Sequence, residues 1–202
     1  MSSALSDKTI RSIISSGFNI VEPFDENSLQ PASIDLKLGN IHYKYKVNEY
    51  ILGEYLNDEI VDKEEFEELH LKHGEIAFIG INEKISIPQD TIGIIFPRSS
   101  ITRLGIQIIT TYMNPGYVGN MPLTIINHSR MEITLKPGYR VAQLVLISLT
   151  ELPDINYKER TNAKYYNEKV DYSKLHTDKE LEEMMDEILK QETPVLYKMM
   201  KT

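Results

Sequence analysis

Two serines stand between two arginines in the segment "PRSSITRLG", residues 97–105. If the segment makes one helical turn after a strand, Ser99 or Ser100 lies at the start of the turn and Arg103 follows on the same side. Gly105 then lets the chain leave with a positive φ. Backbone N–H groups, a hydroxyl and a guanidinium that converge on one point form a site for an anion such as phosphate. The local chemistry leaves a second interpretation equally open, in which a serine caps the turn and the arginine is a surface residue.

Composition limits the partners of such a site. The chain has 202 residues, 41% of them hydrophobic, and a formal net charge of −8, which is typical of a globular domain. The negative charge argues against nucleic acid as a partner but allows a small anion in a local cationic pocket. Cysteine is absent, which excludes disulfides and thiolate metal sites. No apolar run approaches the length of a membrane span, and residues 1–17 lack a signal-peptide core, so we expect a cytoplasmic protein with no membrane partner.

Short apolar runs surround the segment and would have to position it. Each run is bounded by Gly, Pro, Asn or Asp, which is typical of the strands of a β-sandwich, jelly roll or small barrel. The runs are "EIAFIGI" (75–81), "KISIPQD" (84–90), "TIGIIFP" (91–97), "IQIITTYM" (106–113), "MPLTIIN" (121–127), "EITLKPG" (132–138) and "VAQLVLISL" (141–149). We therefore expect a mainly β fold.

A helix is expected at each end of this β body. Ser6 can cap the first helix and Gly17 suits its exit, with an apolar face formed by Ile10, Ile13 and Ile14. Residues 177–191 have a clear helical period, and Thr177 or Asp178 can cap them.

Two further segments lie between the first helix and the strand runs. Residues 30–40 alternate like a strand, with a turn expected at Gly39–Asn40. Residues 55–75 are acidic and are expected to form a solvated excursion between strands. His70 and His73 in that excursion are expected to be solvated, so no residue is assigned to a metal site.

Motifs in a fixed order make the chain similar to the dCTP deaminase and dUTPase superfamily, and most of all to its dCTP deaminase branch. Residues 1–176 carry the resemblance, and residues 177–202 are interpreted as a C-terminal helical extension. The motifs are "LSDK" (5–8), "LQPASIDLKLG" (29–39), "PRSSITRLG" (97–105), "MNPGYVGNMPLTIIN" (113–127), "LKPGYRVAQLVL" (135–146) and "AKY" (163–165).

The resemblance implies a dUTPase-like distorted β-barrel or jelly roll that assembles as a homotrimer with nucleotide pockets between subunits. It also implies that Mg²⁺ bridges phosphate oxygens of the nucleotide. The residues that it assigns to phosphates are Arg98, Ser99, Ser100, Arg103, Tyr157 and Lys164. A lysine and a phenol are suitable partners for a polyanion. Without the resemblance, Lys164 would be interpreted as a solvated surface lysine.

The sequence departs from the family where the chemistry occurs. Asn114 stands at the position of an aspartate, Thr124 at the position of a glutamate, and Glu168 where an amide is common. Neither Asn114 nor Thr124 can act as a general base, and losing such a base commonly costs about 10²–10⁴-fold in rate. An ionised Glu168 only accepts hydrogen bonds, so the recognised base or sugar can differ. Tyr117 stands at an aromatic position of the pocket wall.

These departures favour a nucleotide-binding protein that senses or sequesters a nucleotide without efficient catalysis. The first alternative is an active dCTP deaminase that forms dUTP or dUMP. The second is a regulatory protein-interaction module on the same fold, with the acidic excursion and the terminal helix as its contact surfaces.

Overall fold

The computed structural model describes residues 3–52, 58–160, 163–169 and 173–192. The chain divides into two compact units, residues 1–44 with 63–171 and residues 45–62 with 172–202. The α-helices are α1 (Asp7–Ser15), α2 (Ser99–Thr102) and α3 (Lys179–Glu192), and the 3₁₀ turns are η1 (Glu26–Ser28), η2 (Asp58–Ile60), η3 (Tyr157–Glu159) and η4 (Leu175–Thr177). The strands are β1 (Val21–Glu22), β2 (Leu29–Gln30), β3 (Ser33–Tyr45), β4 (Val61–Glu65), β5 (Leu69–Leu71), β6 (Ile76–Ile81), β7 (Lys84–Ser86), β8 (Thr91–Pro97), β9 (Ile106–Ile108), β10 (Thr111–Met113), β11 (Val118–Gly119), β12 (Pro122–Asn127), β13 (Ile133–Leu135) and β14 (Arg140–Ser148).

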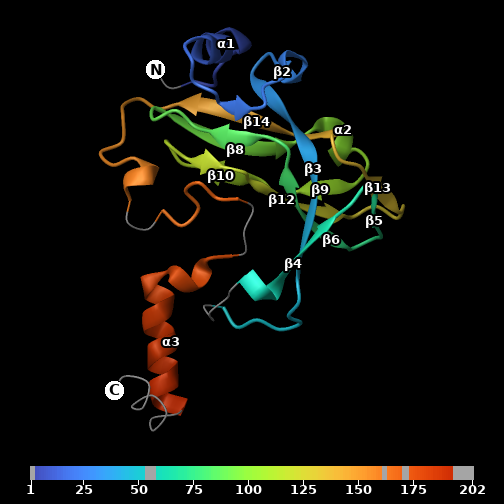
Figure 1. Cartoon of the computed structure of the whole chain (residues 1–202), viewed down its shortest axis with the longest axis vertical. Coiled ribbons are helices and arrows are strands. Elements are labelled where there is room, and N and C mark those ends of the chain that lie inside the picture. Colours follow the sequence, from blue (N-terminus) through green and yellow to red (C-terminus); the bar gives the residue numbers. More distant parts are fainter. Residues whose placement is uncertain (1–2, 53–57, 161–162, 170–172, 193–202) are drawn as a thin grey trace. The chain divides into compact units, whose positions relative to one another are not determined.

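The larger unit is built on one curled antiparallel sheet, which confirms the mainly β prediction. Its strand order is β10-β8-β14-β3-β6-β12-β9, and β2 and β4 also pair with β3. The long strand β3 pairs with β14 through Ile34 to Lys37 and with β6 through Leu38 to Tyr43, so it joins the two halves of the sheet (Figure 1). Two small sheets, β1-β7-β11 and β13-β5, complete this unit.

Alternation along the strands builds the core of this unit. On β12, the side chains of Leu123 and Ile125 are buried, while those of Pro122, Thr124 and Ile126, which alternate with them, are only half-buried. On β8 and β14, Ile95 and Leu144 face the same core. This period of two is the pattern expected for strands with one buried face.

The other face of β10, β8 and β14 is also apolar but incompletely covered. Ile94 and Val145 are half-buried on this face, and Tyr112, which pairs with Ile94, is 54% exposed. Phe96, two residues along β8 from Ile94, is 39% exposed. A run of large apolar side chains over three adjacent strands marks a candidate contact surface.

The N-terminal helix confirms its prediction in most respects. Ile10 is fully buried, and Gly17 follows the helix with φ +94°. Ser6 occupies the cap position, but its hydroxyl lies 3.4 Å from that of Thr9 and makes no capping bond to a backbone N–H. The helix is held to the sheet by the N–H of Asp7, which donates to the carbonyl of Pro31.

The predicted turn at Gly39–Asn40 is wrong. Strand β3 runs through both residues, and its register against β6 shifts between Leu38 and His42. A Cβ at Gly39 would lie 2.5 Å from the carbonyl oxygen of Gly80, so only glycine allows the two backbones to approach this closely. The glycine therefore marks a bulge inside a strand and not the end of one.

Two other predictions are corrected. The run "IQIITTYM" is not one strand, because β9 pairs with β12 while β10 pairs with β8. The acidic stretch 55–75 is not a plain excursion, since it contains β4 and β5. Its side chains are largely exposed, as expected, and two of its carboxylates pair with lysines elsewhere in the chain, Glu64 with Lys44 at 2.5 Å and Glu68 with Lys136 at 2.5 Å. Residues 53–57 of this stretch lie outside the described residues.

The smaller unit contains the predicted terminal helix. Helix α3 begins at Lys179, directly after Asp178, and its side chains Met184 and Ile188 are exposed. The N–H of Ser173 donates to the hydroxyl of Tyr45 over 3.0 Å within this unit. Among the described helices, none has the length and apolarity needed to cross a membrane. The boundary between residues 1–176 and 177–202 stays a prediction.

Candidate functional site

The serine–arginine segment forms the predicted helical turn. Strand β8 ends at Pro97, and α2 begins at Ser99. The N–H of Arg103 donates to the carbonyl of Ser99 over 3.1 Å, and Gly105 follows with φ +80°. Ser99, Ser100 and Arg103 all have exposed side chains. The local structure is confirmed, and phosphate binding by these residues stays a prediction.

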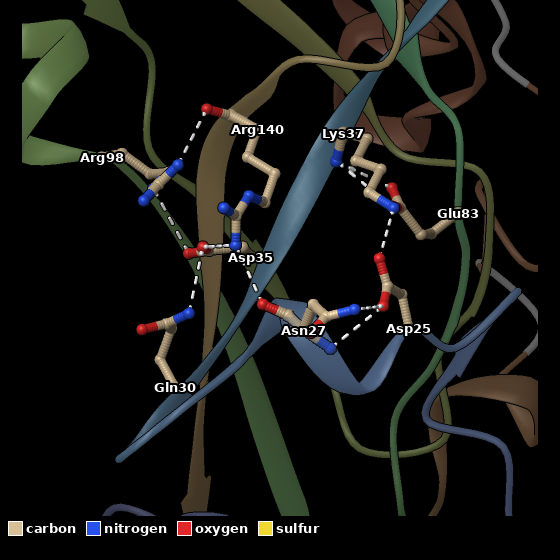
Figure 2. Close-up of polar contacts among 8 residues, drawn as sticks. All are labelled: Asp25, Asn27, Gln30, Asp35, Lys37, Glu83, Arg98 and Arg140. Atoms are coloured by element: carbon tan, nitrogen blue, oxygen red, sulfur yellow. Dashed lines mark hydrogen bonds and ion pairs between the residues drawn. The ribbon is translucent and has the colours of Figure 1, made fainter.

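A buried carboxylate holds the arginine that precedes this turn. Asp35 on β3 is 1% exposed and lies 3.4 Å from Nε of Arg98 and 3.3 Å from Nη1 of Arg140, as Figure 2 shows. Gln30 donates to the same carboxylate over 3.3 Å, and Arg140 also donates to the carbonyl of Asn27 over 2.9 Å. The network joins β2, β3, β14 and the end of β8, so it fixes where α2 starts.

Burial and neighbouring charges act on the Asp35 carboxyl in opposite directions. Burial is the larger effect and raises the pKa of Asp35 above its usual value, while the positive charges of Arg98 and Arg140 lower it in part. Arg98 is therefore committed to an internal ion pair. By contrast, no described contact occupies the guanidinium of Arg103, at least within the part of the chain that the structure describes. Arg103 is thus the exposed cation of the α2 segment.

A second group of predicted residues gathers on the turn after β10. The N–H of Tyr117 donates to the carbonyl of Asn114 over 3.0 Å, and Gly116 takes φ +78°. Two backbone hydrogen bonds fix the turn to Ile87. The N–H of Gly116 donates to the carbonyl of Ile87 over 3.1 Å, and the N–H of Ile87 donates to the carbonyl of Tyr117 over 2.8 Å. The side chain of Asn114 is exposed, while Tyr117 is 3% exposed. We call residues 114–120, which comprise this turn and the short strand β11, the hairpin loop.

Tyr157 connects this hairpin loop to the segment that follows β14. Its N–H donates to the carbonyl of Pro115 over 3.1 Å, and its hydroxyl accepts the N–H of Tyr165 over 3.1 Å. Its ring centroid lies 6.3 Å from that of Tyr117. The phenol of Tyr157, which the resemblance assigns to a phosphate, therefore holds the chain that carries Lys164. We call residues 163–169 the tail segment.

Glu168 of the tail segment is buried against Tyr117. The Tyr117 hydroxyl donates to Oε1 of Glu168 over 2.5 Å, and Glu168 is 8% exposed. Burial, and then the charge of Glu168, raise the pKa of Tyr117, so the phenol stays protonated and donates. A Cβ at Gly119 would lie 2.7 Å from the Tyr117 hydroxyl and 2.8 Å from Cγ of Glu168, so glycine makes room for the pair.

Thr124 and Lys164 complete the predicted set. Thr124 lies on β12 opposite Phe78, half-buried, and its carbonyl accepts the N–H of Ile109 over 3.0 Å. Lys164 is half-buried in the tail segment. Among the contacts described for residues 98–169, none joins the side chain of Thr124 to those of Asn114 or Tyr117.

The two groups of predicted residues lie at opposite ends of β8. Met113 pairs with Gly93, whereas α2 begins beyond Pro97. The four strand steps from Gly93 to Pro97 alone span about 13 Å. Figure 1 shows α2 beyond one end of β8 and the orange segment that follows β14 at the other. Within one chain, α2 and the hairpin loop are therefore too far apart to bind the same phosphate group.

A cleft of about 340 Å³ opens beside the hairpin loop. It lies where the register between β3 and β6 shifts, and Asn40, Asn82, Asn120 and Lys169 are among the residues that line it. The described residues contain no group of three or more His, Asp or Glu side chains arranged to hold a metal ion.

Sequence reasoning missed the partners of both groups. Asp35 is the one charged residue in the run "SIDL", and its place in an apolar strand was the available signal for a buried ion pair. The hydrogen bond between Tyr117 and Glu168 joins residues 51 positions apart, and no local sequence pattern predicts it.

Comparison with known proteins relates the chain to one family. Residues 4–149 match the family model described as dCTP deaminase-like. A "dCTP deaminase, dUMP-forming" of Dictyoglomus turgidum is 33% identical over 175 residues, covering 82% of this chain and 90% of that protein. One of the same name from Methanobrevibacter smithii is 32% identical over 191 residues, covering 88% and 97%.

A solved structure shows the same fold. The 2'-deoxycytidine 5'-triphosphate deaminase of Agrobacterium tumefaciens superposes with a TM-score of 0.59 at 22% identity. The match covers 73% of this chain and 48% of that one, so this chain spans about half the length of that protein.

Proposed function

Because the chain belongs to the dCTP deaminase-like family, we propose that it binds dCTP and deaminates the cytosine ring. The observation that carries the proposal is the 33% identity, over 82% of the chain, with a relative named for this reaction. The exposed Ser99, Ser100 and Arg103 of α2 support it, because they offer hydroxyls and a cation to a triphosphate.

The site is proposed to form between copies of the chain. Ser99, Ser100 and Arg103 of one copy would hold the phosphates, together with Tyr157 and Lys164 of another copy, whose Asn114 and Thr124 would face the sugar and base. The separation of these groups along β8 supports this, since one chain cannot bring them together. The incompletely covered apolar face of β8, β10 and β14 is a suitable subunit contact, and the resemblance favours a trimer.

Mg²⁺ is proposed to enter with the nucleotide. The described residues hold no cluster of carboxylates and imidazoles that could cage the ion. Phosphate oxygens and water are the ligands that Mg²⁺ prefers, so the triphosphate itself would supply most of its coordination. The ion would neutralise phosphate charge, and Arg103 and Lys164 would supply cationic contacts from the protein.

The reaction requires water to add at C4 of cytosine and ammonia to leave, which converts dCTP to dUTP. Hydrolysis of dUTP to dUMP and pyrophosphate would complete the conversion that the names of the relatives describe. A carboxylate usually moves these protons, and Asn114 and Thr124 cannot do so. We therefore expect turnover about 10²–10⁴-fold slower than with both carboxylates present.

A second candidate function is binding without turnover. The observation that favours it is the pair of uncharged side chains at Asn114 and Thr124. A site that keeps its phosphate contacts but lacks a general base can still sequester or sense a nucleotide. In that case the protein would not deaminate dCTP at all, instead of deaminating it slowly.

A mass balance separates the two candidates. The protein is incubated with Mg²⁺ and either dCTP, dUTP or cyclic nucleotides, and filtrates are chromatographed before and after heat denaturation. New dUTP or dUMP from dCTP, lost in Arg103→Ala, supports deamination. A nucleotide that leaves the filtrate and returns unchanged supports binding alone. If no nucleotide is retained or converted, both candidates fail and the regulatory protein-interaction module is the remaining interpretation.

A further inference from the structure

The tail segment is fastened to the hairpin loop by backbone and side-chain contacts within the chain. The N–H of Asn167 donates to the carbonyl of Val118 over 2.8 Å, and the N–H of Asn120 donates to the carbonyl of Glu168 over 2.9 Å. Gly119 and Glu168 form a parallel bridge between these two hydrogen bonds. The tail segment therefore runs beside the hairpin loop like a short added strand.

The side chain of Glu168 lies at the centre of this contact. Its carboxylate accepts the Tyr117 hydroxyl over 2.5 Å, and both residues are more than nine-tenths buried. A hydrogen bond to a charged acceptor that is shielded from water is stronger than one between neutral groups. Asn167 takes φ +55°, a left-handed conformation that bends the chain so that Glu168 turns inward.

We propose that Glu168 is a positioning residue that holds the tail segment against the hairpin loop, and that it does not read the base. The proposal rests on the proposed function for the location of the nucleotide site. It differs from the interpretation drawn from the sequence, in which a carboxylate in place of an amide changes the preferred base. The Glu168 carboxylate is 8% exposed and accepts the Tyr117 hydroxyl, so it presents little surface to a base edge, whereas the tail segment that it holds carries Lys164.

Two variants test the proposal from either side of the bond. Glu168→Gln keeps the shape of the side chain and removes its charge, and Tyr117→Phe removes the donor. Glu159→Gln is the matched control, because Glu159 is an exposed carboxylate in the same C-terminal part of the β unit. Hydrogen exchange of the Asn167 and Asn120 amides, without nucleotide, reports directly on the contact between the tail segment and the hairpin loop.

The expected result is faster exchange of these two amides, by about tenfold in Glu168→Gln and about 10- to 100-fold in Tyr117→Phe. The double variant should add little to Tyr117→Phe, because both changes break one bond. Unchanged exchange in core amides, such as those of β12, would separate this local effect from loss of folding. Glu159→Gln should match the wild type throughout.

Affinities for dCTP and dUTP provide the second measurement. If Glu168 positions the tail, Glu168→Gln and Tyr117→Phe weaken both nucleotides by the same factor, about threefold to tenfold. Unchanged exchange in both variants would overturn the proposal, and so would a tenfold change in the dCTP-to-dUTP affinity ratio confined to Glu168→Gln. Since the exchange measurement needs no nucleotide, it stands even if the proposed function fails.

Discussion

The α2 segment and the hairpin loop carry the two halves of the proposed site, and they differ in what they retain. The α2 segment keeps two exposed serines and the exposed Arg103, and a buried Asp35 network fixes its start. The hairpin loop keeps its turn, its Gly116 and its buried Tyr117, but Asn114 in the loop and Thr124 on the following strand β12 are uncharged side chains at the two carboxylate positions. In the proposed site, phosphate binding and proton transfer would thus reside in separate elements, and a chain could change one without disturbing the other.

Restoring both carboxylates should have the largest effect. In Asn114→Asp with Thr124→Glu, we expect the rate of dCTP deamination to rise about 10²–10⁴-fold, because a general base becomes available. Ammonia release under saturating dCTP measures this rate. Asn114→Asp alone is the matched control, since it restores one charge without a carboxylate at position 124. An unchanged rate in the double variant would mean that the hairpin loop does not face the reacting ring.

Removing the exposed guanidinium of α2 should have the next largest effect. Arg103→Ala should weaken dCTP binding about 10- to 100-fold, because a charge-assisted bond to phosphate is lost. Arg130→Ala, which removes another exposed arginine, should bind normally. Isothermal titration measures both, and equal affinities for the two variants would remove α2 from the site.

Breaking the Asp35 network should affect both stability and binding. We expect Asp35→Asn to lower the free energy of unfolding by about 2 kcal/mol, less than for a fully buried pair because Arg98 and Arg140 are partly exposed. Affinity for dCTP should fall as the start of α2 loosens. Urea denaturation measures the stability, and Asp154→Asn, at an exposed aspartate, is the control. A loss of stability without a loss of affinity would show that Asp35 does not serve the site.

Glu83 should have the smallest effect, visible as a pH dependence. It is 4% exposed, accepts the N–H of Lys37, and has a pKa that burial raises from 4.5. The folded state then holds this proton more tightly than the unfolded state, so ionisation of Glu83 destabilises the fold. Relative to Glu83→Gln, the wild type should lose stability as the pH rises from 4.5 through the raised pKa. Urea denaturation at several pH values measures this difference, and a difference that grows with pH in favour of the wild type would contradict it.

Local patterns predicted much of this molecule, and contacts between distant residues limited the rest. Apolar runs predicted most strands of the β unit. An apolar face followed by Gly17 predicted α1, and the position of Gly105 predicted the end of the α2 turn. The sequence did not predict that β3 continues through Gly39, because the glycine is required by the close approach of Gly80, a tertiary contact that no local pattern reveals. The strands β4 and β5 were hidden in an acidic stretch because the lysines that partner their region lie elsewhere in the sequence.

The sequence predicted which residues belong to the candidate site, but it did not predict which contacts those residues make. The motif "PRSSITRLG" indicated a phosphate site, yet the commitment of Arg98 to Asp35 depends on strand pairing that no local pattern reveals. The burial of Glu168 against Tyr117 likewise depends on where the tail segment lies.

A single-turnover experiment tests the central claim most directly. With protein in excess over labelled dCTP and Mg²⁺ present, the deoxynucleotide is quantified over hours for the wild type and for Arg103→Ala. The account predicts slow conversion of dCTP to dUTP or dUMP with one ammonia released per ring, and none with Arg103→Ala. Quantitative recovery of dCTP from the wild type, with the restored carboxylates equally inactive, would contradict it.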